Sequence, residues 1–284
     1  MNSIDEKKVV FITGASSGIG KAVAEIFADN GHIVYGTTRK IDISKSFERD
    51  EKTFMGNIYK LVYLDVCDEN TIYKAVNYIL SKEKKIDILI NNAGFGIAGS
   101  IEDLSTQEMI EQFDTNLFGV HRMCKALLPV MRKQGAGTII NVGSMASIFT
   151  IPFQSAYSAS KAALDSLSEA LRMECSRFGI KICVVEPGDT KTSFTHNRIY
   201  AKNAMNDDSA YKDTMIKSVS VMEKDEINGD SPQKVAKVIA KIALSKNPPI
   251  RICIGLKYKL FAFIKRFVPD SLKILVLSRM YKVN

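Results

Sequence analysis

The most informative stretch of this chain is Thr13-Gly14-Ala15-Ser16-Ser17-Gly18-Ile19-Gly20. It follows an apolar run, Val9-Val10-Phe11-Ile12, and leads into an amphipathic segment that begins at Ala22. A strand, a glycine-rich turn and a helix in this order present free backbone N–H groups at the helix N-terminus, where the phosphates of a dinucleotide bind. Three residues separate Gly14 from Gly18, which departs from the general G-x-G-x-x-G spacing, but the flanking strand and helix support the same interpretation.

Apolar runs alternate with segments of helical periodicity through most of the chain. Strands are expected at 8–13, 33–38, 59–64, 86–90, 138–142, 181–186 and 250–254, and helices at 19–29, 69–82, 106–133, 155–178 and 231–245. Continuous apolar strands separated by helices predict a parallel sheet covered on both faces. We therefore predict an α/β protein, a Rossmann-type doubly wound sheet of about seven parallel strands, with residues 1–255 as the cofactor-binding catalytic domain.

Two regions do not follow this alternation. Residues 193–229 are polar and irregular in pattern, and a connection of that length predicts a substrate lid. Residues 256–284 are predicted to form a basic amphipathic C-terminal extension of two short helices, broken at Pro269-Asp270. From Lys246 onward the chain has nine basic residues and one acidic residue, a surplus equal to the whole formal net charge of +8.

The C-terminal extension allows three interpretations. The preferred one is that it folds back over the substrate pocket or a subunit contact and buries Leu260, Ile264, Phe267 and Leu275. A second is that it lies on an acidic membrane surface, and a third is that it is an exposed tail. The local placement of the positive charge argues against a nucleic-acid-binding domain.

The composition of the chain indicates its cellular location and the kinds of site that it can form. The chain has no apolar stretch long enough to span a membrane, and the short segment before the first strand leaves no room for a signal peptide. Its five cysteines lack C-x-x-C spacing and its histidines number three, so we expect reduced thiols and no metal site. The predicted location is cytoplasmic, with peripheral membrane contact as the alternative.

A candidate proton-transfer pair lies in the predicted helix at 155–178. Tyr157 and Lys161 are four residues apart and therefore share one helix face. The ammonium group is expected to lower the pKa of the phenol toward a useful range. Ser144 follows the strand at 138–142, at the sheet edge where ligands bind in such folds, and its hydroxyl can hold a substrate oxygen. With the dinucleotide turn, these residues predict hydride transfer.

The end of the second strand predicts the choice of dinucleotide. An acidic residue there accepts from the ribose 2′-hydroxyl of NAD, whereas a basic residue accommodates the 2′-phosphate of NADP. Here the strand runs into Arg39-Lys40 with no carboxylate, which predicts NADP(H). The alternative is that Arg39 is a solvated loop residue.

Over nearly its whole length the chain resembles the short-chain dehydrogenase/reductase family, through the glycine turn, Leu64-Asp65-Val66, Asn91-Asn92-Ala93-Gly94, Tyr157-x-x-x-Lys161 and Pro187-Gly188-Asp189-Thr190-Lys191-Thr192. The resemblance implies a catalytic tetrad of Asn116, Ser144, Tyr157 and Lys161, in which Asn116 holds a water that links Lys161 to solvent. It implies cofactor contacts by Gly14, Ser16, Ser17, Gly18, Ile19, Gly20, Arg39, Asp65, Val66, Asn92, Ala93, Gly94, Tyr157, Lys161, Pro187, Gly188, Thr190 and Thr192. Many NADP-using members have a second basic residue where this chain has Ser17, so the NADP prediction rests mainly on Arg39, with Lys40 as a second basic residue that can assist.

A narrower resemblance is to the hydroxysteroid-dehydrogenase-like branch of that family. It rests on Asn91-Asn92-Ala93-Gly94-Phe95-Gly96, on Val185-Glu186-Pro187-Gly188 and on the basic, Leu/Phe-rich C-terminus. It implies interconversion of a secondary alcohol and a ketone on a bulky apolar substrate such as a steroid, by a homodimer or homotetramer. The expected pocket wall is Phe95, Ser144, Met145, Phe149, Phe153, Tyr157 and Phe194. The alternatives are a reductase of acyl-chain or small aldehyde and ketone substrates, and a non-catalytic NADP-binding sensor or scaffold.

Overall fold

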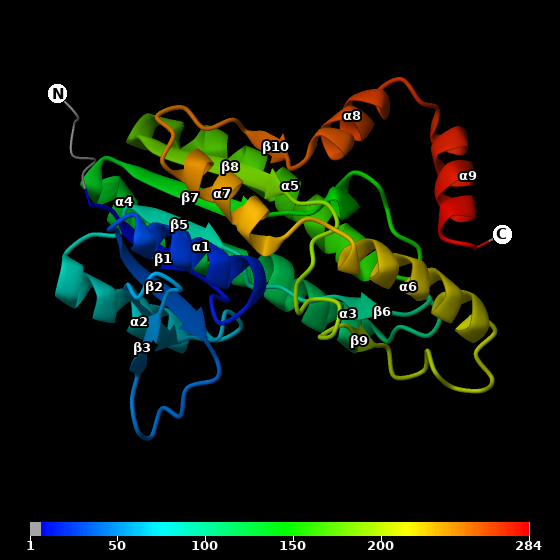
Figure 1. Ribbon diagram of the computed structural model, residues 1–284, viewed down its shortest axis with the longest axis horizontal. Helices are drawn as coiled ribbons and strands as arrows, with labels where there is room; N and C mark the ends of the chain where they lie inside the picture. Colours follow the sequence, from blue (N-terminus) through cyan, green and yellow to red (C-terminus); the bar gives the residue numbers. More distant parts are fainter. Residues whose placement is uncertain (1–6, 284) are drawn as a thin grey trace.

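The computed structural model describes residues 7–283, which build a twisted sheet between two helical layers (Figure 1). The strands of the sheet are β1 (Val9–Ile12), β2 (Ile33–Thr38), β3 (Glu48–Lys52), β4 (Ile58–Tyr63), β5 (Ile88–Asn91), β7 (Gly137–Val142), β8 (Ile180–Glu186) and β10 (Arg251–Cys253). Their spatial order is β10-β8-β7-β5-β1-β2-β4-β3, and every neighbouring pair is parallel except β3 with β4. The predicted Rossmann-type α/β fold is confirmed.

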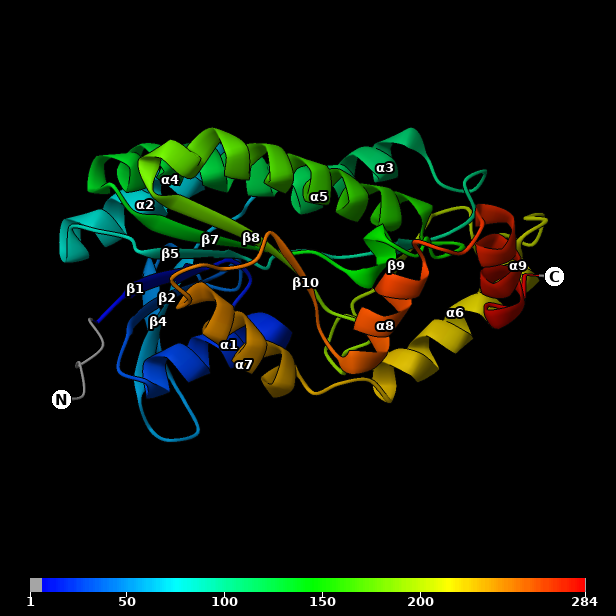
Figure 2. The same ribbon diagram turned by 90° about the horizontal axis from the view of Figure 1, so that it is seen from above.

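Helices cover both faces of the sheet (Figure 2). The helices are α1 (Gly18–Asp29) and α7 (Pro232–Ala243) on one face, and α2 (Glu69–Glu83), α4 (Gly119–Gln134) and α5 (Ser155–Cys175) on the other. Side chains alternate along each strand, so Val10 and Ile12 pack with α1 and α7 while Val9 and Phe11 pack with α2, α4 and α5. Two apolar cores result, one on each side of the sheet.

The seven predicted strands are all present, and within residues 7–283 the large sheet contains an eighth. Strand β3 reads Glu-Arg-Asp-Glu-Lys and pairs antiparallel with β4 at the sheet edge. Its charged side chains suit an exposed edge, and they give no hydrophobic signal by which a strand could be recognised. The single helix expected at 106–133 is in fact α3 (Thr106–Phe113), a π-helical turn (Asp114–Phe118) and α4.

The segment 193–229 is more regular than its sequence pattern indicated. Strand β9 (Ile199–Tyr200) pairs with β6 (Ile97–Ala98), and α6 (Lys212–Ile227) follows. Along α6, Met215, Val219 and Met222 recur at helical spacing and bury against β6. The expectation of an irregular segment is therefore wrong for its second half.

The C-terminal extension consists of α8 (Leu256–Ile264) and α9 (Asp270–Met280), which lie beyond the sheet (orange and red in Figures 1 and 2). Within the single chain the expected burial is not found, because these residues are 41% to 73% exposed: Leu260, Ile264, Phe267 and Leu275. Their burial in a subunit contact stays a prediction. Tyr258 holds α8 in place: its hydroxyl donates to Asp189 Oδ2 and accepts from the Asp189 N–H at 3.0 Å. Among residues 7–283, no helix is long and apolar enough to cross a membrane.

Candidate active site

A cavity of about 1240 Å³ lies at the carboxyl ends of the parallel strands. It extends from the glycine turn, past the first turns of α5 and the loop after β8, to α6, α8 and α9. Strand β1 lies between β2 and β5, so the chain reverses direction across the sheet here, and α/β folds bind ligands at such a switch point. Pockets for one ligand measure roughly 300–1000 Å³, so this volume accommodates a dinucleotide together with a substrate.

The glycine turn is built by close backbone packing. Gly14 and Gly18 have φ of +67° and +56°, which side chains rarely adopt, and a Cβ on Gly20 would lie 2.4 Å from the Gly14 oxygen. Asn92 fixes the turn, because its Nδ2 donates to the carbonyls of Thr13 (2.9 Å) and Gly14 (3.0 Å). In the described chain no side chain at the N-cap hydrogen-bonds to the first turn of α1, so its N–H groups are available to phosphate oxygens.

Nearly all of the predicted cofactor contacts share this cavity. Every one of them lines it except Gly20, which lies behind the turn and permits its shape. At the end of β2, the Arg39 side chain is 73% exposed and its Nη1 lies 3.7 Å from Asp65 Oδ2. Such an exposed ion pair contributes little to stability. The guanidinium is therefore available to a phosphate.

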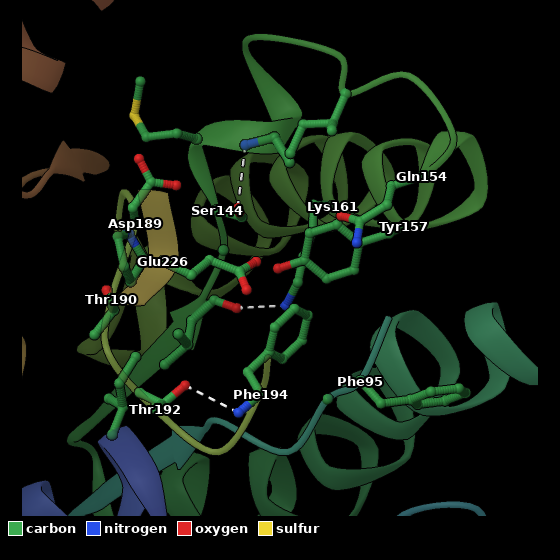
Figure 3. A pocket seen from close by; sticks show the side chains of 18 of the residues that line it. Phe95, Ser144, Gln154, Tyr157, Lys161, Asp189, Thr190, Thr192, Phe194 and Glu226 are labelled. Carbon is green, nitrogen blue, oxygen red and sulfur yellow. Dashed lines mark hydrogen bonds between the residues drawn. The ribbon is translucent and has the colours of Figure 1, made fainter. Parts of the chain in front are cut away.

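Tyr157 and Ser144 face the cavity side by side (Figure 3). Tyr157 is 9% exposed, and its burial raises the pKa of the phenol to about 12, although a hydrogen bond with Ser144 acts in the opposite direction. The sequence predicted a lowered pKa because of the Lys161 ammonium, and this prediction is wrong for the structure described. Desolvation of the phenolate outweighs the neighbouring charges. The phenol is therefore protonated at neutral pH.

Lys161 and Asn116 meet behind Tyr157, beside Gly94. Lys161 Nζ donates to the Val142 carbonyl at 2.8 Å, and burial lowers the pKa of its ammonium group to about 8. A Cβ on Gly94 would lie 3.2 Å from Asn116 Oδ1 and 3.8 Å from Lys161 Nζ. Because Gly94 has no side chain, the Asn116 amide and the Lys161 ammonium can both lie beside it, as the predicted tetrad requires.

Asn116 is held by a distorted stretch of helix. It lies in the π-helical turn between α3 and α4, a distortion that is frequent at functional sites. Its Oδ1 accepts from the Phe95 N–H (3.1 Å), and its Nδ2 donates to the Phe95 carbonyl (3.0 Å) and to Ser160 Oγ (3.2 Å). Asn116 itself does not line the cavity, and the water that it was predicted to hold stays a prediction.

The predicted substrate wall is assembled with one exception. The cavity is lined by Phe95, Ser144, Met145, Phe149, Tyr157 and Phe194. The Phe194 ring lies 5.5 Å from the Tyr157 ring, centroid to centroid. Phe153 was placed in this wall wrongly: it packs instead against the small apolar cluster of β6 and α6. The backbone turns back at this residue, where φ is +59°, before α5 begins.

Sequence reasoning missed several polar residues of the cavity. Glu226 and Asp225 come from the last turn of α6, Asp189 from the loop after β8, and Gln154 from the residue before α5. Gln154 could have been predicted as a cavity residue, because it lies three residues before Tyr157 in the sequence. Glu226 gave no such signal because its helix was not recognised. No group of His, Cys, Asp or Glu residues within 7–283 is arranged to hold a metal ion.

Comparison with known proteins agrees with this geometry. A family model described as short chain dehydrogenase matches residues 8–203. A 3-ketodihydrosphingosine reductase of Bacteroides thetaiotaomicron is 42% identical over 98% of this chain and 100% of that protein. Retinol dehydrogenase 8 of Bos taurus is 32% identical over 94% and 88%, respectively. These relatives support the broad family and do not single out its hydroxysteroid branch.

Solved structures share the same architecture. A short-chain dehydrogenase from Streptomyces avermitilis superposes with a TM-score of 0.78 at 30% identity, covering 98% of both chains. Others hold either coenzyme: a Burkholderia phymatum protein with NAD (TM-score 0.76, 22% identity, 90% and 92% coverage) and ElxO with NADP (0.70, 28%, 89% and 99%). The glycine turn, the open helix N-terminus and the cavity beside Tyr157 fit such a nicotinamide dinucleotide. By motif, fold and site alike, the chain is a member of the short-chain dehydrogenase family of oxidoreductases.

Proposed function

We propose that this protein is an NADPH-dependent reductase that converts the ketone of a long-chain amino ketone, 3-ketodihydrosphingosine, to the secondary alcohol. The observation that carries the proposal is the end-to-end match, at 42% identity, to a reductase of that compound. The match covers 98% of this chain, and so includes most of the C-terminal extension as well as the nucleotide fold. This substrate replaces the steroid that the narrower sequence resemblance suggested.

The lining of the cavity supports a long-chain substrate. One side of the C-terminal extension faces the cavity with apolar side chains: Phe261, Ile264, Val268, Leu272, Val276, Leu277 and Met280. A wall of aliphatic and aromatic groups drawn from two helices favours an extended hydrocarbon chain, because burying each CH₂ is worth about 0.8 kcal/mol. The reacting ketone would lie at the other end, beside Tyr157 and Ser144.

Tyr157 is the proton donor in the proposed reduction. When bound in this cavity, NADPH would supply the hydride for the carbonyl carbon. Tyr157, whose buried phenol keeps its proton at neutral pH, donates that proton to the carbonyl oxygen. Ser144 holds the same oxygen by a hydrogen bond, and we assign to Lys161 and Asn116 the replacement of the proton that Tyr157 gives up.

The preference for NADPH rests on the end of β2. Thr38, Arg39 and Lys40 line the cavity there, and the strand ends without the carboxylate that reads the ribose of NAD. An exposed guanidinium suits bidentate contact with a 2′-phosphate. The similar structures hold either coenzyme, so the proposal depends on Arg39.

A substrate comparison tests the proposed function. The purified protein is assayed with NADPH by the fall in nicotinamide absorbance, with products identified by mass spectrometry, on 3-ketodihydrosphingosine, a 3-ketosteroid, all-trans-retinal and a short aliphatic ketone. We expect kcat/KM to be highest, by at least about tenfold, for 3-ketodihydrosphingosine, since its chain fills the apolar wall. A higher value for the steroid or retinal would contradict the proposal, and NADPH binding without turnover of any substrate would favour the sensor alternative.

We also propose that the outer side of the C-terminal extension contacts an anionic membrane surface, from which a lipid substrate enters. Several large apolar side chains there point away from the cavity and are more than half exposed: Leu256, Leu260, Phe263, Phe267 and Ile274. Lysines and arginines are interleaved with them, and they carry most of the surplus charge of the protein. A second copy of the chain, in a homodimer or homotetramer, is the competing occupant of this surface.

Replacing Leu260, Phe263 and Phe267 together by Ser is expected to abolish cosedimentation with phosphatidylserine vesicles, because the apolar contact is lost while the charge remains. The wild-type protein should bind these vesicles, less so as salt is added, and should not bind neutral ones. Phe54→Ser is the matched control, since Phe54 is fully exposed in the β3–β4 turn. Unchanged vesicle binding by the triple variant, or its conversion from an oligomer to a monomer, would contradict the membrane proposal.

A further inference from the structure

The wall of the cavity beside Tyr157 is acidic. Asp189, Asp225 and Glu226 line it. Arg198 pairs with Glu226 and Lys257 lies near Asp225, while Lys161 lines the same cavity with its ammonium 5.8 Å from the centre of the Tyr157 ring. Figure 3 shows the Glu226 carboxylate directed toward the Tyr157 hydroxyl from the opposite side of the cavity. Glu226 also lies in the last turn of α6, where the helix dipole adds partial negative charge. A cationic group next to the reacting carbon would be stabilised here.

Glu226 has hydrogen-bonding capacity to spare. Its Oε2 accepts from Thr195 Oγ1 at 2.6 Å, and its Oε1 accepts from Arg198 Nη2. A carboxylate has about four acceptor positions, so these two bonds fix its orientation and leave others for a ligand. Burial raises the pKa of Glu226. A rise of this kind means that the hydrogen bonds and charges around the carboxylate do not fully replace the water that it lost on burial.

Gln154 independently indicates a polar ligand at this position. Its side chain is 2% exposed and lines the cavity, and its Nε2 finds no hydrogen-bond partner among residues 7–283. A buried donor without a partner costs about 1–3 kcal/mol, so such groups usually serve a ligand or a water. In Figure 3 the amide lies beside the Tyr157 ring, on the side away from Glu226. An acceptor oxygen next to the reacting ketone would satisfy it.

We propose that Glu226 binds the ammonium group, and Gln154 the neighbouring hydroxyl, of a 2-amino-1-hydroxy-3-ketone whose carbonyl oxygen lies at Tyr157. This inference rests on the proposed function and deepens it, because it assigns residues to the polar head that distinguishes an amino ketone from a steroid or retinoid. The apolar wall accepts any long chain. The Glu226 carboxylate on one side of Tyr157 and the unpartnered Gln154 amide on the other favour substrates that have an amino and a hydroxyl group next to the ketone.

Glu226→Gln is expected to lower kcat/KM for 3-ketodihydrosphingosine by about 10- to 100-fold, the worth of a charge-assisted hydrogen bond. For the des-amino analogue, 1-hydroxyoctadecan-3-one, it should change kcat/KM less than threefold or so, since no ammonium is lost. Glu223→Gln is the matched control: Glu223 also pairs with Arg198, at 3.5 Å, but does not line the cavity. Gln154→Leu should lower kcat/KM for both ketones, since both contain the hydroxyl.

An equal loss on both ketones in Glu226→Gln, or no loss on either, would overturn the assignment of Glu226. If Glu223→Gln lowers kcat/KM by a similar factor, the assignment is also overturned, because Glu226 would then act only by holding Arg198 in place. Failure of the proposed function gives a different result: the wild-type protein then prefers the des-amino ketone or a steroid to the amino ketone. Calorimetric binding of dihydrosphingosine to the NADPH-loaded protein reports on the same carboxylate without turnover, because alcohol and reduced coenzyme cannot react with each other, and Glu226→Gln should weaken this binding by the same factor.

Discussion

Tyr157→Phe is expected to lower kcat for ketone reduction by roughly 10²–10⁴-fold, the usual contribution of a positioned general acid. The substitution removes one oxygen and leaves the ring in contact with Phe194, so the packing of the site is preserved. NADPH binding, followed by fluorescence, should be nearly unchanged, and the thermal midpoint should move little. Initial rates under saturating NADPH, at several ketone concentrations, separate the loss of kcat from any change in KM.

The matched control for this variant is Tyr281→Phe. Tyr281 also lines the cavity, but it lies at the end of the C-terminal extension. Its hydroxyl has no assigned part in proton transfer, so kcat should stay within a few-fold of the wild-type value. Near-wild-type kcat in Tyr157→Phe would contradict the proton-donor role, and so would an equal loss in Tyr281→Phe.

The nucleotide-binding half of the site was predictable because its signals are local. Strand, glycine turn and helix follow one another in 21 residues, Val9 to Asp29, and the backbone angles of Gly14 and Gly18 follow from their residue type. Ser144 and Tyr157 likewise sit where strand and helix periodicity placed them. The ends of parallel strands converge at one edge, so separate motifs meet there by topology alone.

The substrate half was less predictable because its contacts depend on packing over long separations. Glu226 faces Tyr157 across the cavity because α6 buries Met215, Val219 and Met222 against β6. The sequence gives no local sign that these two elements pack together. Phe153 shows the converse error: it was assigned to the substrate wall because it is aromatic, whereas its backbone directs the ring into the cluster of β6 and α6. The raised pKa of Tyr157 was missed for a similar reason, since it arises from burial, which the sequence does not give.

Coenzyme choice is expected to depend on Arg39. Arg39→Ala should weaken NADPH binding by about 10- to 100-fold, because the 2′-phosphate loses a charge-assisted contact. NADH binding should be nearly unchanged, since that coenzyme has no 2′-phosphate to lose a partner. The measurement is the dissociation constant of each coenzyme by fluorescence titration, together with kcat/KM for each on one ketone. Lys40→Ala is the matched control, because Lys40 also lines the cavity and its substitution removes the same single positive charge.

The ratio of the two coenzyme affinities distinguishes a specific phosphate contact from a general effect of charge. If Arg39 binds the 2′-phosphate, the preference for NADPH over NADH should be largely lost in Arg39→Ala and should change much less in Lys40→Ala. The reason is that a guanidinium binds phosphate through two directed hydrogen bonds, whereas an ammonium acts as a point charge. Stability should not change in either variant, since the 3.7 Å pair between Arg39 and Asp65 is exposed. Thr38→Asp should shift the ratio further toward NADH by placing a carboxylate near the ribose. Equal weakening of both coenzymes in Arg39→Ala would mean that Arg39 serves the shared part of the dinucleotide, and the NADPH preference would then lack its basis.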